Sequence, residues 1–447
     1  MPSSPMKEHD DSPSDYATGV RAQYEAYPFP LRDPEDESQR LIITEQDSLA
    51  KLNHFCFAGR QRFGDGFRVL VAGGGTGDHT VFLAEQLRDY DAQVTYVDIS
   101  RPSLDIARKR SEVRGLSNIE WHHSSILDLP SLGLAPFDLI SCTGVLHHLP
   151  EPERGLEALR AVLAPDGAMS LMLYGRVGRM AVYAGQELMR LVNEGVDDPK
   201  VKTRHARVLV QCLPDTNWFV RGGSREKILE EFVEDESNLN DTLLHEQDRA
   251  YSVPEIYAFL AGAALELIEF TSFWTNPPCC RFMYDPNSWI SEPALRTHIA
   301  RMPLARQQAI AEAMNCVITC HGFYAAPRAA GRVALPDDPD MVPFFLDLDP
   351  SELARHFRDA VGRECRLDYR RNTIQFRVTP YSAELVAGID GMRSIGELME
   401  RVRRARGDGI SHEELMAGFM AFYQPLNTLD ALLLRHRSVS PFRHYPS

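Results

Sequence analysis

The sequence lacks any apolar run long enough to cross a membrane. A spanning helix needs about 20 consecutive apolar residues, and no run in the 447-residue chain reaches about 18. Residues 1–16 are polar, rich in Ser, Pro and Asp, and without the apolar centre of a signal peptide. We therefore expect residues 1 to about 15 to be a disordered tail, and no part of the chain to enter a membrane.

The chain also has fewer basic than acidic residues, and its cysteines form no recognisable metal-binding or disulfide pattern. The chain has 48 Lys and Arg against 63 Asp and Glu, which gives a formal net charge of −15. Such a surface repels phosphate backbones, so nucleic acid is not the expected partner. The eight cysteines show neither metal-ligand spacing nor a secretory disulfide pattern. We therefore predict no metal site and a reducing, cytoplasmic setting. A homodimer is compatible with the sequence.

Short apolar runs and helical patterns alternate through the first half of the chain. Strands are predicted at residues 67–72, 93–97, 119–122, 137–142 and 168–174. Helical spacing of apolar residues lies between them, at residues 80–87, 100–114 and 153–163. Strands separated by helices of this length form βαβ units, which predicts an α/β fold with a parallel sheet.

The alternation stops after residue 174. Residues 176–250 are predicted to be a helical insertion, and two late strands, at 265–273 and 316–325, are predicted to close the sheet as an antiparallel pair. Proline-rich residues 327–343 indicate a linker. The expected domains are an N-terminal tail and lid-like arm (1–60), an α/β domain (61–330) and a small C-terminal domain (335–447).

The C-terminal domain has a different pattern. A helix near Ser351, a hairpin of 365–369 with 374–378, and a last helix at 427–435 are predicted. Two capping boxes, Ser394 with Glu397 and Ser411 with Glu414, predict two further helix starts. This is a small α+β unit of winged-helix character, suited to dimerisation, stability or peptide binding.

The segment with the clearest chemical meaning is a glycine-rich turn. Gly73, Gly75 and Gly77 form G-x-G-x-G directly after the first strand and directly before a helix. Glycine permits positive φ and a close ligand approach, and the helix start presents unpaired N–H groups. Asp98 follows at the end of the second strand, where a carboxylate can accept both hydroxyls of a ribose. The pair predicts an adenosine-like ligand and leaves open which one.

Three later motifs decide between the candidate ligands. They are Ser-Ile-Leu-Asp-Leu-Pro at 125–130, Thr-Gly-Val-Leu-His-His-Leu at 143–149, and Pro-Asp-Gly at 165–167. Together with the glycine turn they resemble the class I S-adenosylmethionine (SAM)-dependent methyltransferases, especially the small-molecule branch with "LHH" after strand four. The resemblance covers roughly residues 60–175. It implies a Rossmann-like seven-stranded methyltransferase sheet with a helical insertion, and SAM as the cofactor.

The resemblance also implies roles for individual residues. The three glycines would hold the methionine part of SAM, and Asp98 the ribose. Asp128 would contact the adenine amino group, with Ile126 or Leu127 packed beside the ring. The implied cofactor set is completed by Ile99 and Thr143. One departure is Val71, where the family often has an acidic residue.

Methyl transfer is an in-line displacement that requires a positioned acceptor and, for some acceptors, a base. His147, His148 and Tyr174 follow strands four and five at the carboxyl edge of the sheet and are the catalytic candidates. The alternative is structural: histidines in a turn more often cap it and pack the next helix, and Tyr174 would be a rim residue.

Three further segments have two interpretations each. Residues 24–30 form either a lid over the cofactor or a rigid surface turn. The cluster of His245, Asp248, Arg249 and Tyr251 lines an acceptor pocket or, as we favour, a solvated salt-bridge face. A second solvated face is expected for the arginines of one helix, rather than a nucleic-acid patch: Arg401, Arg403, Arg404 and Arg406.

The sequence thus predicts an enzyme that transfers the SAM methyl group to an O, N or C atom of a small metabolite or peptide. A SAM-sensing regulatory protein without turnover is one alternative. An NAD-dependent oxidoreductase of Rossmann type is another, and it would need a second βαβαβ half that the chain after residue 174 does not show.

Overall fold

The computed structural model describes residues 18–221, 232, 234–245, 247–272, 280–370, 372–407 and 409–445, and the predicted tail lies outside them. The chain forms two compact units. Unit 1 consists of Met1–Thr44, Gly64–Leu265 and Glu312–His321, and unit 2 of Glu45–Phe63, Glu266–Ala311 and Gly322–Ser447. The expected domain boundaries at 60/61 and 330/335 remain a prediction.

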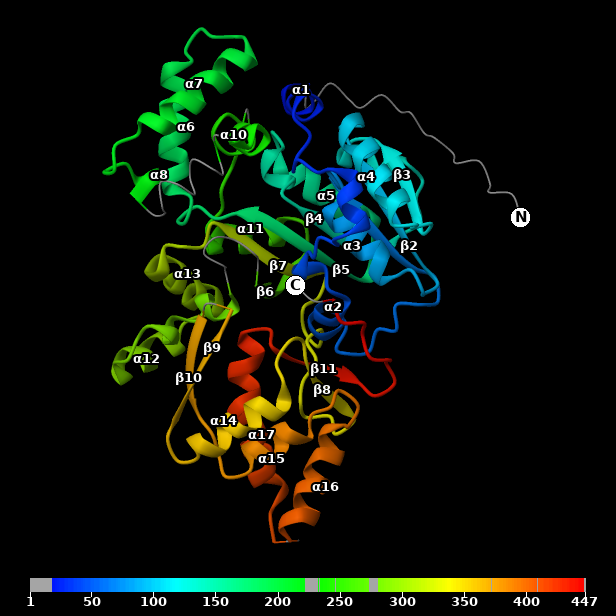
Figure 1. The fold of residues 1–447 in the computed structure, drawn as a ribbon, viewed down its shortest axis with the longest axis vertical. Helices are drawn as coiled ribbons and strands as arrows, with labels where there is room; N and C mark the ends of the chain where they lie inside the picture. The colour runs from blue at the N-terminus through cyan, green and yellow to red at the C-terminus, as the bar shows by residue number, and fades with distance from the viewer. Residues whose placement is uncertain are drawn as a thin grey trace, which may run out of the picture. The chain divides into compact units, whose positions relative to one another are not determined.

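A seven-stranded sheet organises the fold, with the order β3-β2-β1-β4-β5-β7-β6 (Figure 1). The pairs of β1 with β2 and β4, of β2 with β3, and of β4 with β5 are parallel, and β6 pairs antiparallel with β7. The strands are β1 (Phe67–Ala72), β2 (Ala92–Asp98), β3 (Ile119–His123), β4 (Phe137–Thr143), β5 (Leu163–Tyr174), β6 (Glu266–Thr271) and β7 (Cys320–Ala326). The predicted Rossmann-like sheet and its antiparallel closing pair are confirmed.

The strand order reverses at β1. The chain moves outward from β1 to β2 and β3, then returns to the other side of β1 for β4 and β5. Ligands bind in open α/β sheets where the order reverses, outside the carboxyl ends of the strands. The turns after β1, β2 and β4 therefore meet at one place.

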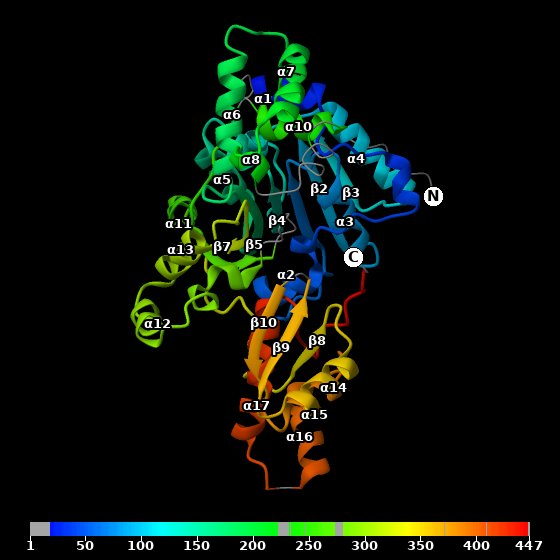
Figure 2. The ribbon, with the colours of Figure 1, turned by 60° about the vertical axis from the view of Figure 1, so that its left-hand side comes forward.

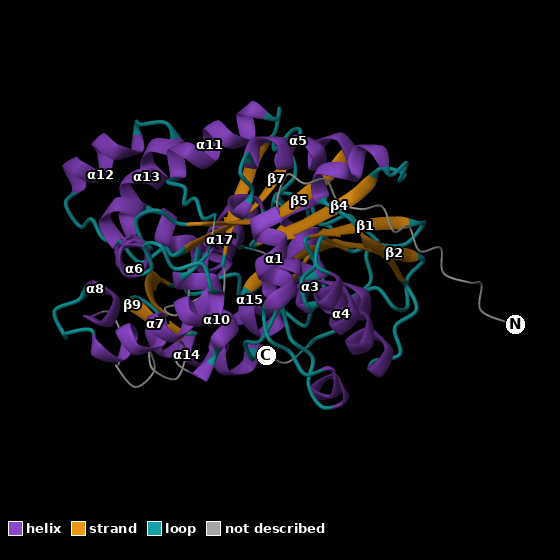
Figure 3. Ribbon diagram, turned by 90° about the horizontal axis from the view of Figure 1, so that it is seen from above, coloured by secondary structure: helices purple, strands orange, loops and turns teal. Residues whose placement is uncertain are grey.

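Helices cover both faces of these strands. In Figure 3, α3 and α4 lie on one side of the strands, and α5 and α11 on the other. Their bounds are α3 (Asp78–Gln86), α4 (Arg101–Val113), α5 (Pro152–Val162) and α11 (Val253–Gly262). Ser100 caps α4 through its side chain, which accepts a hydrogen bond from the Ser103 N–H. This cap places the start of α4 next to the end of β2.

The insertion is helical, as predicted. It contains α6 (Met180–Val192), α7 (Pro199–Cys212), α8 (Trp218–Arg221) and α10 (Glu236–Leu243). These helices share a small apolar core that includes Met189, Val210 and Leu239. Figures 1 and 2 show α6, α7 and α10 gathered near α1 (Thr18–Ala26). No helix among the described residues is long and apolar enough to span a bilayer.

Among the remaining elements, the helix near Ser351, the hairpin and the two capped helices agree with the predictions. The helices are η2 (Pro34–Ser38), η3 (Glu45–Asp47), α2 (Leu49–Cys56), η4 (Ile126–Ser131), η5 (Leu146–His148), η7 (Arg281–Tyr284), η8 (Pro286–Ser288), α12 (Pro293–Ala300), α13 (Leu304–Asn315), α14 (Pro350–Ala360), α15 (Ser382–Gly388), α16 (Ile395–Arg406) and α17 (His412–Thr428). The hairpin is β9 (Glu364–Tyr369) with β10 (Asn372–Arg377). Both predicted capping boxes start helices, α16 and α17.

Two predictions for the C-terminal region are wrong. The last helix, expected at 427–435, is replaced by a strand, β11 (Leu432–His436), which pairs antiparallel with β8 (Met341–Phe345) inside the expected linker. Asp430 has a φ of 56°, which ends the helical path of α17. Pro343 is tolerated because β8 belongs to a two-stranded sheet, where no second neighbour needs its N–H.

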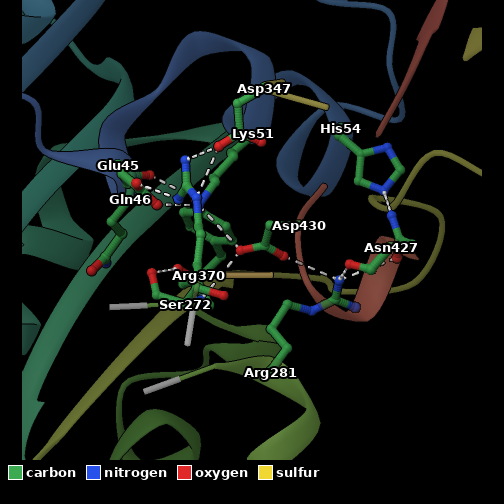
Figure 4. A network of polar contacts seen from close by, with 12 residues as sticks. Glu45, Gln46, Lys51, His54, Ser272, Arg281, Asp347, Arg370, Asn427 and Asp430 are labelled. Atoms are coloured by element: carbon green, nitrogen blue, oxygen red, sulfur yellow. Dashed lines mark hydrogen bonds and ion pairs between the residues drawn. The ribbon is translucent and has the colours of Figure 1, made fainter. Parts of the chain in front are cut away.

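Unit 2 contains a network of buried charges, shown in Figure 4. The Lys51 side chain is 1% exposed, and its Nζ lies 3.2 Å from carboxylate oxygens of both Glu45 and Asp430. Arg281 pairs with Asp430 on the other side, at 3.4 Å. Burial alone would raise the pKa of Asp430, but the two cations bring it below its ordinary value. The network thus joins α2 to the C-terminal segments within this unit.

Candidate functional site

The glycine turn after β1 has a backbone that only glycine suits. Gly73, Gly75 and Gly77 have φ values of 73°, 52° and 103°. A Cβ on Gly73 would lie 2.3 Å from the Val145 side chain, and one on Gly75 would lie 2.8 Å from the Phe29 carbonyl oxygen. Positive φ and close packing therefore both exclude larger residues. The prediction of unpaired N–H groups is wrong for residues 73–77, because each donates a hydrogen bond within the protein, Gly73 to the Val97 carbonyl and Gly75 to Asp98 among them.

Asp98, the last residue of β2, is hydrogen-bonded to this turn. One carboxylate oxygen accepts the Gly75 N–H at 2.8 Å, and the other accepts the Ser100 N–H at 2.8 Å. Burial raises the pKa of Asp98, while the two amides act in the opposite direction. The carboxylate is thus fixed against the glycine turn, next to the strand at which the order reverses.

The N-terminal arm packs on the same turn. The Thr76 N–H donates to the Phe29 carbonyl at 3.3 Å, and the Thr76 hydroxyl donates to the Pro30 carbonyl at 2.7 Å. The Ser100 hydroxyl donates to the Tyr24 carbonyl at 3.1 Å. Residues 24–30 therefore pack directly against the glycine turn and the start of α4. Their role as a lid over the cofactor stays a prediction.

A buried ion cluster holds this arm in place. The Arg110 guanidinium, with a side chain 1% exposed, donates to the Thr76 carbonyl and pairs with both Glu37 and Asp78. Glu37 on η2 also pairs with Arg114 at 2.8 Å. The arm, α4 and the glycine turn are therefore joined through one arginine.

The residues expected to hold the adenine lie in η4, which follows β3. Ile126 is buried, and the Ser125 side chain caps the segment by accepting the Leu127 N–H at 3.2 Å. Asp128 is half-buried, and its carboxylate makes no hydrogen bond or ion pair within the described part of the chain. Ile99 directly follows Asp98 and accepts a hydrogen bond from His123 at its carbonyl.

Two further predicted residues are Thr143, the last residue of β4, and His147, in the middle of η5. The Thr143 hydroxyl is buried and has no hydrogen-bond partner among the described residues. His147 is fully buried, and neither of its ring nitrogens has a partner among those residues. Burial lowers the pKa of His147 well below its ordinary value, so the ring is neutral. Buried polar groups without partners are uncommon in folded proteins and indicate a place for a ligand or water.

His148 has a defined tautomer. Its Nδ1 lies 2.8 Å from the Gln247 carbonyl, which can only accept, so Nδ1 carries the proton and Nε2 keeps a free lone pair. Burial lowers the pKa of His148 to about 4. The Tyr174 ring, at the end of β5, lies 5.5 Å from the His148 ring and 3.9 Å from that of His147. The structure thus brings the three catalytic candidates together.

Asp241 on α10 is a site residue that sequence reasoning missed. Its carboxylate is buried and accepts hydrogen bonds from the hydroxyls of Tyr24, at 2.9 Å, and Tyr174, at 3.2 Å. The α10 sequence, ESNLNDTL, has no motif that marks this position. Only the packing of the insertion over β5 brings the carboxylate here.

His148, Asp241 and His245 have ligand-type atoms within 4.8 Å of one another. The two imidazole rings are stacked, with centroids 3.7 Å apart and an interplanar angle of 20°. Lone pairs of parallel rings do not converge on one ion. The Gln247 N–H also donates to His245 Nδ1, which leaves the proton on Nε2. This geometry fits a hydrogen-bonding cluster, and we assign no metal.

The prediction of a solvated salt-bridge face around residue 248 is wrong for three of its four residues, because Tyr251 is fully buried and His245 and Asp248 are at least partly buried. The Asp248 side chain is 2% exposed and lies 3.4 Å from Arg179, whose guanidinium stacks over the Tyr174 ring at 3.5 Å. His245 belongs to the buried cluster described above. Arg249 does form an exposed pair, with Glu153 at 2.8 Å. The second face is confirmed: Arg404 and Arg406 make exposed pairs with Glu400 and Glu384.

Residues 70–169 match a family model described as a methyltransferase domain. The match begins in β1 and includes the glycine turn, Asp98, Asp128 and the two histidines of η5. The chain contains a class I SAM-dependent methyltransferase domain.

The chain is similar to several known proteins, one of which is named a methyltransferase. An uncharacterized protein from Synechococcus sp. is 31% identical over 58% of this chain and 61% of its own length. The tRNA 5-carboxymethoxyuridine methyltransferase of Escherichia coli K12 is 28% identical over 39% of this chain and 68% of its own. The structure of PKMT2 from Rickettsia typhi in complex with AdoHcy superposes with a TM-score of 0.61 at 15% identity, over 91% of this chain and 77% of that one. That likeness shows a shared fold.

Proposed function

We propose that the methyltransferase domain binds SAM and transfers its methyl group to an O, N or C atom of a small metabolite or peptide. The observation that carries the proposal is the fixed pair of Gly75 and Asp98, at the point where the strand order reverses. A second βαβαβ half, which an NAD-dependent oxidoreductase would use, has no counterpart in the antiparallel β6 and β7.

The residues present fit an adenosyl cofactor. The glycine turn would receive the methionine part, and Asp98 the ribose hydroxyls. Asp128 would accept a hydrogen bond from the adenine amino group, with Ile126 or Leu127 packed beside the ring and with Ile99 and Thr143 also next to the cofactor. The carboxylate of Asp128 and the hydroxyl of Thr143, both without partners among the described residues, support this placement. SAM supplies an activated methyl group, so the protein need not activate it.

The catalytic roles follow from the protonation states. His148 keeps a lone pair on Nε2 and would take a proton from the acceptor. His147 would bind the acceptor, because both of its ring nitrogens lack partners. Tyr174 would orient the acceptor from the end of β5. The acidic chain, at −15, supports a small acceptor rather than the nucleic acid implied by the name of the E. coli relative.

Ligand binding tests the proposal directly. Thermal shift and calorimetry with SAM, S-adenosylhomocysteine (SAH) and NAD should show binding of the first two ligands alone. Labelled SAM with candidate acceptors should then give labelled product. Stabilisation by NAD only would contradict the proposal, and tight SAM binding without any acceptor turnover would support a sensor instead.

A further inference from the structure

Asp241 is a buried carboxylate without a cation. Its two hydrogen-bond donors are the neutral hydroxyls of Tyr24 and Tyr174, and it forms no ion pair with any described residue. Two other buried carboxylates of unit 1 do have one, since Glu37 pairs with Arg110 and Asp248 with Arg179, whereas Asp98 accepts two backbone N–H groups instead. A buried charge is costly unless a counter-charge accompanies it. Asp241 therefore lacks the direct counter-charge that Glu37 and Asp248 have.

The histidines near Asp241 do not supply that charge. His148 and His245 are the nearest imidazoles, with ligand-type atoms within 4.8 Å of the carboxylate. Burial lowers their pKa values to about 4 and about 3, so both are neutral at neutral pH. Arg179 is already paired with Asp248. Burial raises the pKa of Asp241, while His245 and Arg179 act in the opposite direction, so a cationic ligand beside the carboxylate would favour its charged form.

Asp241 is placed toward the proposed cofactor site. Tyr24 donates from its side chain to Asp241, while its backbone carbonyl accepts from Ser100, whose N–H is bonded to Asp98. On the other side, Tyr174 connects Asp241 to the end of β5. One tyrosine thus links the carboxylate to the residue expected to hold the ribose, and another links it to the strand ends near the catalytic histidines.

Resting on the proposed function, we propose that Asp241 is the counter-ion of the positively charged sulfonium of bound SAM. Because SAH has a neutral sulfur, the same carboxylate distinguishes substrate from product. In methyl transfer the S–CH3 bond would break with its electron pair going to sulfur, and the acceptor would form the new bond to the methyl carbon. The proton that the acceptor loses would go to Nε2 of His148, whose ring nitrogen lies within 4.8 Å of the Asp241 carboxylate. The carboxylate therefore has a cationic partner before and after methyl transfer, and loses it when the proton leaves.

The ratio of SAM affinity to SAH affinity tests this role without any turnover. Calorimetry on the full chain should show that Asp241→Asn weakens SAM binding by about tenfold or more while changing SAH binding little. Asp241→Glu, which keeps the charge, should retain most of the preference. Asp248→Asn is the matched control, because that buried carboxylate already has Arg179 as its partner, and it should affect both ligands alike.

The outcomes separate this inference from the proposed function. Wild-type protein that fails to bind SAM would overturn the proposed function itself. Wild-type binding combined with an unchanged SAM-to-SAH ratio in Asp241→Asn would overturn only the counter-ion assignment. If Asp241→Asn does not fold, Asp241→Ser removes the same charge with a smaller side chain, and the same ratio decides.

Discussion

Two buried carboxylates of this protein, Asp98 and Asp241, differ in the groups that donate hydrogen bonds to them. Asp98 and Asp241 are both buried and both have pKa values raised by burial. Asp98 is held by two backbone amides, whereas Asp241 has only tyrosine hydroxyls. Backbone amides belong to the loop and need no side-chain partner, so the position of Asp98 is visible in the motif. The partners of Asp241 come from α1 and β5, far from it in sequence.

Replacing Asp98 with Asn should weaken SAM binding. A hydrogen bond to a charged group contributes about 1.5–3 kcal/mol, which corresponds to roughly 10- to 100-fold in affinity. Calorimetry with SAM measures the change. Asp105→Asn, an exposed neighbour on α4 that pairs with Arg101, should bind as the wild type does. Equal affinity of Asp98→Asn and wild type would count against the ribose contact.

Replacing Lys51 with Ala should destabilise unit 2 strongly. The change leaves Glu45 and Asp430 without their shared ammonium, and loss of one partner from a buried ion pair costs about 3–5 kcal/mol. Urea unfolding followed by circular dichroism reports this loss. The exposed Lys109→Ala on α4 should change the free energy of unfolding by less than about 0.5 kcal/mol. If both variants unfold at similar urea concentrations, the buried charge network contributes little to the free energy of unfolding.

At the scale of elements, the N-terminal arm is part of the glycine turn rather than an appendage. Hydrogen bonds from Thr76 to the carbonyls of Phe29 and Pro30 attach it, and Arg110 joins it to α4. The glycine turn, strand β2 and the Ser100 cap of α4 are all visible in the sequence pattern. The arm that packs against the turn comes from residues about 45 positions earlier, which no local pattern connects to it.

Glu37→Gln should loosen this arm. It removes the charge that pairs with Arg110 and Arg114 in a buried position, while keeping the shape of the side chain. Hydrogen exchange of residues 27–38 and of the glycine turn should quicken, and SAM affinity should fall. Glu35→Gln lies on the same helix but is exposed, so its exchange should match that of the wild type. Unchanged exchange in Glu37→Gln would mean that other contacts hold the arm.

At the scale of the whole molecule, buried neutral histidines make stability depend on pH. Burial lowers the pKa of His54 and His245 to about 3, that of His148 to about 4, and that of His147 well below its ordinary value. Unfolding restores ordinary values near 6.5, so the unfolded chain binds protons that the folded chain does not. The contribution of these neutral histidines to the free energy of unfolding is complete above about pH 6.5, and it is lost progressively as the pH falls.

Thermal melting between pH 7.5 and pH 5 should show this decline. Each such histidine contributes a slope of about 1.4 kcal/mol per pH unit once the pH is below its unfolded value. Substituting His54 with Gln should reduce the proton uptake on unfolding by about one. A melting temperature that stays constant over this range would show that the histidines are accessible to protons in the folded state.

The sequence by itself determined the sheet, its glycine turn and the acid on β2. These depend on local rules: apolar runs of strand length, glycine at positive φ, and a helix that starts where a strand ends. The same rules predicted both capping boxes and the hairpin. They were wrong at residues 427–435, because an apolar run of four or five residues suits a strand or a helix, and only pairing with β8 selects the strand.

Only the tertiary structure decided which polar side chains share the site above the strands. Asp241, His245 and Asp248 come from an insertion with no motif, and their burial depends on how α10 packs against α1 and β5. Sequence spacing reports neighbours along one element, whereas a buried charge is defined by neighbours from several. The charge left without a partner at Asp241 therefore became visible only when those elements were placed in space.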